Sequence, residues 1–145
     1  MTKRILVMGL PGSGKTTFSQ ELVKRLMLKH TVKWFNADAV RKEYDDWDFS
    51  PEGRLRQVKR MREMADNSGA DYAICDFVCP KNLYRDFFQP DLTIWMDTIK
   101  ESKYEDTNQL FEEPDKYDVR IIDFEQNEIE NVIRLINAKI GRAHV

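Results

Sequence analysis

The stretch GLPGSGKTTF, residues 9–18, decides the fold. A continuous apolar run at residues 5–8 precedes it, which is typical of a strand covered on both faces. After it, Phe18, Leu22 and Leu26 recur at every fourth residue, a spacing that predicts one face of an amphipathic helix. The decapeptide therefore connects a buried strand to a helix through a glycine-rich turn.

Residues 9–16 fit the pattern G-x-x-x-x-G-K-[ST] of a phosphate-binding loop. Its glycines allow backbone N–H groups to turn toward an anion, and the helix that begins here adds its partial positive charge. An ammonium group at the lysine position reaches the β- and γ-phosphates, and the hydroxyl after it ligates Mg²⁺. The pattern predicts an ATP and Mg²⁺ site made by Gly9, Gly12, Ser13, Gly14, Lys15, Thr16 and Thr17, with Thr16 as the metal ligand.

Further apolar runs at residues 32–35, 72–75, 92–96 and 119–122 read as four more strands. Helical patterns lie between the second and third strands, around residues 40–44 and from residue 51 toward residue 69, and a terminal helical pattern covers residues 129–140. Strands that alternate with helices predict an α/β fold of the P-loop NTPase type. We expect an open, parallel, five-stranded sheet with helices on both faces, and a single kinase domain over residues 1–145.

Composition narrows the class of protein. The 145 residues are 41% hydrophobic and 33% charged, as in a globular protein, and the net charge of −2 gives no overall attraction to nucleic acid or membrane. The N-terminus shows no signal peptide, and no apolar run approaches the roughly 20 residues of a membrane helix. Cys75 and Cys79 lack the partners of a zinc site and read as reduced thiols. We expect a cytoplasmic protein without a membrane partner; its oligomeric state stays open, with a homodimer as the assembly considered.

Acceptor-side residues follow the predicted strands. Asp38 comes after the second strand, at the edge where open α/β sheets bind ligands, so it can position an attacking hydroxyl or take its proton. The alternative is that Asp38 caps the next helix. Phe49 and Phe77 are candidate stacking residues or, alternatively, core aromatics. Of the basic residues in the helix from residue 51, Arg54 is the candidate ligand and the others read as an exposed face.

These segments resemble the adenylylsulfate kinase family over about residues 3–123, in matching order: FNADAVR at 35–41, FSPEGRLRQVKR at 49–60 and DFVCP at 76–80. That family uses ATP to phosphorylate the 3′-hydroxyl of adenylyl sulfate in sulfate assimilation. The resemblance implies that Asp38 and Arg41 contact the acceptor, and that Phe49 and Phe77 enclose its adenine. It also implies that Arg54 grips the phosphosulfate and that Gln57 stands where the family has asparagine.

The chain departs from the family in two places. Asn36 replaces the first aspartate of the family's D-G-D, whereas Asp76 stands where the family has a small residue, so Asp76 is a candidate for electrostatic compensation. The lid at residues 98–110 is short and keeps only Lys100 and Lys103 as cations. Either the reaction is slow or Lys103 and a partner supply the missing charge.

The leading prediction is an ATP-dependent phosphotransferase, with Lys15 and Asp38 as catalytic residues, that acts on adenylyl sulfate or a related nucleotide-like acceptor. The absence of an N-K-x-D motif disfavours a GTPase. One alternative is a polynucleotide 5′-kinase, although the acidic chain argues against a nucleic acid partner. The other is a nucleotide-binding module that has lost catalysis.

Overall fold

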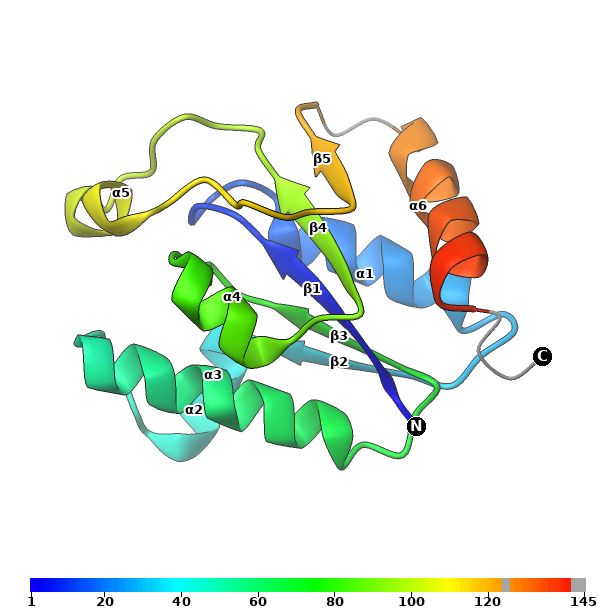
Figure 1. The fold of residues 1–145 in the computed structure, drawn as a ribbon, viewed down its shortest axis with the longest axis horizontal. Helices are drawn as coiled ribbons and strands as arrows, with labels where there is room; N and C mark the ends of the chain where they lie inside the picture. The colour runs from blue at the N-terminus through cyan, green and yellow to red at the C-terminus, as the bar shows by residue number, and fades with distance from the viewer. Residues whose placement is uncertain (124–125, 142–145) are drawn as a thin grey trace.

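Five parallel strands form one sheet in the order β2-β3-β1-β4-β5 (Figure 1). The computed structural model describes residues 1–123 and 126–141. The strands are β1 (Lys3–Met8), β2 (Val32–Asn36), β3 (Tyr72–Asp76), β4 (Leu92–Met96) and β5 (Val119–Ile121). The predicted five-stranded parallel sheet is confirmed, and the glycine-rich turn follows its central strand.

Helices cover both faces of the sheet, as predicted. On one face lie α1 (Lys15–Leu26) and α6 (Gln126–Lys139); on the other lie α2 (Ala37–Tyr44), α3 (Pro51–Asp66) and α4 (Asn82–Phe88) (Figure 1). A short α5 (Glu105–Leu110) lies beyond the carboxyl ends of the strands. The sequence did not predict α4 or α5. In the part of the chain that the structure describes, no helix has the length and apolar character needed to span a membrane.

The core consists of two apolar clusters, one on each face of the sheet, because successive side chains of a strand point to opposite sides. Ile5 and Val7 pack with α1 and α6 residues, whereas Leu6 and Met8 pack with α3 residues. All four side chains of this β1 run are fully buried. The apolar run therefore anchors the start of the phosphate loop rigidly at the centre of the molecule.

Local capping sets where the helices begin. Pro51 opens α3, and the Ser50 side chain accepts the N–H of Gly53 at 3.2 Å, as the sequence predicts. The cap of α2 is Asn36, whose Oδ1 accepts the N–H of Ala39 at 3.0 Å. The capping role considered for Asp38 is therefore wrong, because Asn36 already satisfies the first turn of α2.

Candidate active site

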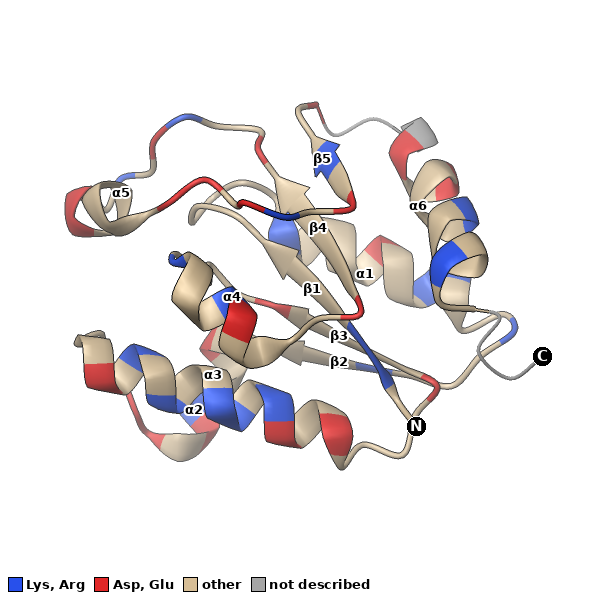
Figure 2. Cartoon of the chain, in the orientation of Figure 1, with Lys and Arg blue, Asp and Glu red and all other residues tan. Residues whose placement is uncertain are grey.

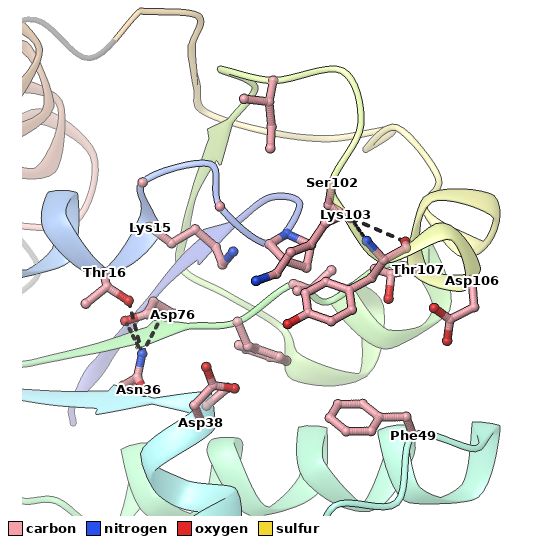
Figure 3. A pocket seen from close by; sticks show the side chains of 18 of the residues that line it. Lys15, Thr16, Asn36, Asp38, Phe49, Asp76, Ser102, Lys103, Asp106 and Thr107 are labelled. Carbon is pink, nitrogen blue, oxygen red and sulfur yellow. Dashed lines mark hydrogen bonds between the residues drawn. The ribbon is translucent and has the colours of Figure 1, made fainter.

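A cavity of about 1250 Å³ opens at the carboxyl ends of the strands, between the glycine-rich turn, the start of α2 and the segment that leads into α5 (Figure 3). It exceeds the roughly 300–1,000 Å³ of common ligand pockets, so it has room for two ligands. Asp38 and Phe49 lie across it from Lys15, and Ser102 and Lys103 lie on a third side. The site residues predicted from the sequence that do line this cavity are Gly12, Gly14, Lys15, Thr16, Thr17, Asp38, Phe49, Arg54 and Phe77.

Glycine is required at two positions of the loop for different reasons. Gly14 precedes α1 with a φ of 94°, in the left-handed region, so α1 begins without a side-chain cap and its first-turn N–H groups face outward. Gly9 does not line the cavity; a Cβ there would lie 2.5 Å from the carbonyl oxygen of Met96 in β4. Gly9 therefore lets the loop pack closely on the sheet, whereas Gly14 opens the helix end toward an anion.

The loop residues fit a bound phosphate. The Ser13 side chain is buried, does not line the cavity, and its Oγ has no hydrogen-bond partner in residues 1–123 and 126–141. Lys15 is held close to the loop because its Nζ donates to the carbonyl of Leu10 at 2.9 Å. Free amide donors at the helix end and this ammonium together form an anion site.

Lys15 is a partly buried cation in the unliganded protein. Burial lowers its pKa to about 8, and the nearby carboxylates of Asp76 and Asp38 oppose part of that change. Burial disfavours the charged form of Lys15, and the negative charge of a bound polyphosphate would favour it again. The environment of Lys15 therefore favours the binding of an anion next to its ammonium group.

Asp76 lies at the carboxyl end of β3 with its carboxylate buried beside the loop. Trp34 Nε1 donates to Asp76 Oδ2 at 2.6 Å, and Asn36 Nδ2 donates to Asp76 Oδ1 at 3.1 Å and to Thr16 Oγ1 at 3.3 Å (Figure 3). Burial raises the pKa of Asp76, while these donors and the ammonium of Lys15 oppose the rise. Trp34, predicted to be a core residue, packs on the core but also contacts the site.

Sequence reasoning did not assign Asp76 to the metal. The signal was present, because YAICD is an apolar strand that ends in aspartate beside the strand of the phosphate loop. In P-loop enzymes an aspartate after such a strand holds Mg²⁺ together with the loop Ser or Thr. Thr16 and Asp76 therefore make an oxygen donor pair of the type that Mg²⁺ prefers. Among the described residues no cluster of three or more His, Cys, Asp or Glu side chains offers a complete metal cage.

Asp38 is exposed in the first turn of α2 and lines the cavity opposite Lys15 (Figure 3). Within residues 1–123 and 126–141 its carboxylate makes no hydrogen bond or ion pair. The hydrogen bonds that shape this turn involve Asn36 instead. Asp38 thus presents an available acceptor to whatever occupies the cavity.

Phe49, Phe77 and Arg54 line the cavity together. The Phe49 ring is 49% exposed, whereas Phe77 is 5% exposed and packs edge-on against Phe88 at 5.5 Å. The Arg54 guanidinium lies 5.4 Å from the Phe49 ring, and its Nε donates to the Phe49 carbonyl at 2.9 Å. The structure brings two aromatic walls and one cation to the side of the cavity away from the phosphate loop.

Arg41 and Gln57 line a smaller adjoining cavity of about 70 Å³ rather than the main one. Arg41 is buried, donates to the carbonyls of Asp46 and Asp48 at 3.0 and 3.1 Å, and stacks 4.2 Å from the Phe49 ring. Gln57 donates to the carbonyl of Ala37 at 3.0 Å. Both side chains therefore support the walls of the site through contacts within the protein.

Hydrogen bonds fix the short lid both to the phosphate loop and within itself. Thr98 Oγ1 donates to the Ser13 carbonyl at 2.7 Å, and Asn108 Oδ1 accepts the N–H and hydroxyl of Ser102 at 2.8 and 2.7 Å. Lys103, in the segment that the Ser102–Asn108 contact closes, extends into the cavity (Figure 3). Of the two lid lysines, Lys100 instead pairs with Asp97 at 3.4 Å, so Lys103 alone lines the cavity.

Basic residues gather in the middle of α3, with acidic residues toward its two ends (Figure 2), and several of the basic ones are engaged by contacts within the protein. Arg56 and Arg60 contact Asp46 at 2.7 and 3.0 Å, and Arg62 donates to the Phe87 carbonyl at 3.0 Å. The two guanidinium groups hold the pKa of Asp46 below its usual range. The predicted exposed face is thus partly a network that fixes the loop before α3.

Comparisons with known proteins agree with this arrangement. A family described as an AAA domain matches residues 5–74, which include the phosphate loop, Asp38 and α3. A comparison of the sequence with curated proteins gives no significant match.

Solved structures share the fold over nearly the whole chain. The protein APE1195 is 23% identical, with a TM-score of 0.71 and coverage of 99% of this chain and 97% of that one. A Mycobacterium tuberculosis APS kinase in complex with AMPPNP and APS is 17% identical, with a TM-score of 0.74 and coverage of 94% and 98%. A sugar kinase from Janibacter sp. HTCC2649 is 19% identical, with a TM-score of 0.67 and coverage of 99% and 96%. The fold is that of P-loop small-molecule kinases, and kinases of different acceptors match it about equally well.

Proposed function

We propose that the protein is an ATP-dependent phosphotransferase for a small nucleotide-like acceptor, with adenylyl sulfate as the leading candidate. The observation that carries the proposal is one cavity that joins a phosphate loop to an unpaired carboxylate and two aromatic walls. Its size suits a donor nucleotide and an acceptor together. In this arrangement the loop and Asp38 face each other across the space where a phosphoryl group would move.

On the donor side, the N–H groups at the start of α1 and the Lys15 ammonium bind the phosphates of ATP. Thr16 and Asp76 would provide oxygen ligands for Mg²⁺, and a bound ion would supply positive charge to offset that of the phosphates. The Asn36 amide donates hydrogen bonds to both residues, so Asp76 rather than Asn36 is the candidate ligand. The donor half thus uses residues on β1, α1 and β3.

On the acceptor side, Asp38 orients the attacking hydroxyl and accepts its proton. Phe49 and Phe77 enclose a planar base, and Arg54 binds an anionic group attached to it. Lys103 supplies the lid cation next to the transferring group, whereas Lys100 does not line the cavity. Correct in-line placement of the two substrates accounts for much of the rate of such a reaction.

Two observations weigh against the alternatives. A polynucleotide kinase needs free cations along the backbone path, yet Arg56, Arg60 and Arg62 are engaged by contacts to other residues of the protein. A binding module without catalysis has no use for a carboxylate held unpaired opposite the phosphate loop, which is the position of Asp38. We therefore favour catalysis on a small molecule.

The test is incubation of the pure protein with Mg-ATP and adenylyl sulfate, with 3′-phosphoadenylyl sulfate detected by mass spectrometry. Lys15→Ala is the blank, and Asp38→Asn is compared with Asp106→Asn, a carboxylate of the same cavity on the lid. We expect Asp38→Asn to lose about 100-fold or more in turnover while Asp106→Asn keeps it. Equal rates in the two variants would contradict the role of Asp38.

A parallel reaction with a 5′-hydroxyl oligonucleotide separates the polynucleotide alternative. Product from the oligonucleotide alone would overturn the small-molecule proposal. Tight ATP binding with no transfer to either acceptor would support a binding module.

A further inference from the structure

Asn36, the asparagine at the end of β2 that departs from the adenylylsulfate kinase pattern, lies beside Asp76 at the end of the neighbouring strand β3. Asn36 and Asp76 are register partners in the parallel β2–β3 pair, so their side chains emerge side by side on one face of the sheet. Trp34, two residues earlier in β2, lies on the same face, as does the end of α1 that carries Thr16. Trp34 and Asn36 thus both contact the Asp76 carboxylate, and Asn36 also contacts the Thr16 hydroxyl of the phosphate loop.

The orientation of the Asn36 amide is fixed by a separate contact. Its Oδ1 accepts the N–H of Ala39 at 3.0 Å, so its Nδ2 must face the Asp76 carboxylate and the Thr16 hydroxyl. An aspartate at position 36 would also cap α2, but it would place a second negative charge against a buried one. The amide therefore combines a helix cap with a donor to the carboxylate.

The indole of Trp34 makes the shortest contact to the carboxylate. Its Nε1–H donates to Asp76 Oδ2 at 2.6 Å, whereas Asn36 lies nearer to Oδ1, at 3.1 Å. An indole N–H only donates, and it offers no competing ligand to a cation. The two donors on β2 thus hold the plane of a carboxylate that belongs to β3.

We propose that Trp34 and Asn36 are positioning residues that orient the Asp76 carboxylate for the metal of the bound nucleotide, an inference that rests on the proposed function. The carboxylate of the metal site comes from β3, and neighbouring β2 supplies the hydrogen bonds that fix it. Partners of metal ligands commonly change metal affinity about 10- to 100-fold when they are removed. In this chain the carboxylate that the adenylylsulfate kinase pattern has at position 36 is then replaced by that of Asp76 on the neighbouring strand.

The test measures metal binding without turnover. The Mn²⁺ affinity of the protein is measured by electron paramagnetic resonance in the presence of a non-hydrolysable ATP analogue, and analogue affinity is measured separately with EDTA. We expect Trp34→Phe to weaken Mn²⁺ binding about 10-fold and to leave analogue binding in EDTA within about twofold. The matched control is Trp95→Phe, because Trp95 is buried in β4 and does not line the cavity; it should change neither affinity.

A second variant keeps the test decisive if Trp34→Phe does not fold, as judged by circular dichroism. Asn36→Ser retains a good helix cap but removes the amide donor, and it should also weaken Mn²⁺ selectively. In the Asp76→Asn background, either substitution should add little, since the carboxylate that they orient is gone. Equal losses with and without metal, or full additivity with Asp76→Asn, would overturn the inference.

The outcome of the metal-binding measurement can also be distinguished from the outcome of the test of the proposed function. Because no acceptor is present, a failure to phosphorylate adenylyl sulfate leaves the metal result intact. Conversely, transfer activity with unaltered Mn²⁺ affinity in Trp34→Phe and Asn36→Ser would uphold the enzyme and reject the positioning role.

Discussion

Exchanging Lys15 for methionine removes a charge that the unliganded protein holds at a cost in stability. Burial lowers the pKa of Lys15 from 10.5 to about 8, and nearby carboxylates offset only part of this. The unfolded chain restores the ordinary value, so the unfolded state binds more protons between these two pKa values. The penalty is complete below pH 8 and fades as the pH rises toward 10.5. Relative to Lys15→Met, the wild-type protein therefore gains stability with rising pH.

The size of the effect follows from the two pKa values. The difference between 10.5 and about 8 corresponds to about 3 kcal/mol at about 1.4 kcal/mol per pH unit. Integrated over proton binding, about 1 kcal/mol of this penalty remains near pH 9.5, so the advantage of the variant shrinks by about 2 kcal/mol from pH 6.5. Methionine keeps the length of the side chain, and the Leu10 carbonyl still accepts the N–H of Ser13 at 3.1 Å.

Urea unfolding at about pH 6.5 and pH 9.5, without nucleotide, measures both proteins. The buried thiols Cys75 and Cys79 ionise in the unfolded chain of either protein, so they cancel in the comparison. Saturating Mg-ATP should reverse the order, because only the wild type has the ammonium that binds phosphate. Parallel stability curves across this pH range would refute the reasoning, since they would mean that Lys15 keeps its ordinary pKa in the folded protein.

Three further changes test the lid, the acceptor wall and the loop. Lys103→Ala should lower kcat about 10- to 1,000-fold in steady-state assays, whereas Lys100→Ala, the matched lid lysine, should stay within about twofold; similar losses would mean that neither acts directly on the phosphoryl group. Phe49→Ala should raise the KM for the acceptor about 5- to 100-fold, from the roughly 1–3 kcal/mol of base stacking, with the KM for ATP unchanged; a change in both would indicate a general structural role. Gly9→Ala places a Cβ 2.5 Å from a β4 carbonyl oxygen and should cost about 2–4 kcal/mol in urea unfolding. Gly69→Ala, where φ is 71° but no atom lies within 4 Å, should cost only about 1–2 kcal/mol; equal costs would rule out crowding at Gly9.

The fold was predictable because its determinants are local. Residues 5–8 of β1 are all apolar, and they contribute alternately to the two core clusters. The phosphate-loop motif predicts a strand before it and a helix after it. Ser50 and Pro51 mark the start of α3 in the sequence itself. By contrast, α4 and α5 have 7 and 6 residues, too few for a helical period to stand out.

The site was predictable only in outline, because spacing places a residue at the sheet edge without giving the direction of its side chain. Arg41 and Gln57 occupy the positions that the family resemblance implies, yet both turn to backbone carbonyls of their own scaffold. The contact between Asn36 and Asp76 joins residues 40 apart in the sequence. Their pairing follows from strand order, since β3 lies between β2 and β1.

The charges around the cavity explain why the metal carboxylate matters. Three cations line it, Lys15, Arg54 and Lys103, against four carboxylates: Asp38, Asp76, Glu101 and Asp106. A nucleotide triphosphate adds several more negative charges to this cavity, where unbalanced charge is costly. The other lid lysine, Lys100, does not line the cavity. In the proposed function, charge balance would depend on a divalent ion bound with the phosphates, and the Asp76 carboxylate, held by Trp34 and Asn36, would be one of its ligands.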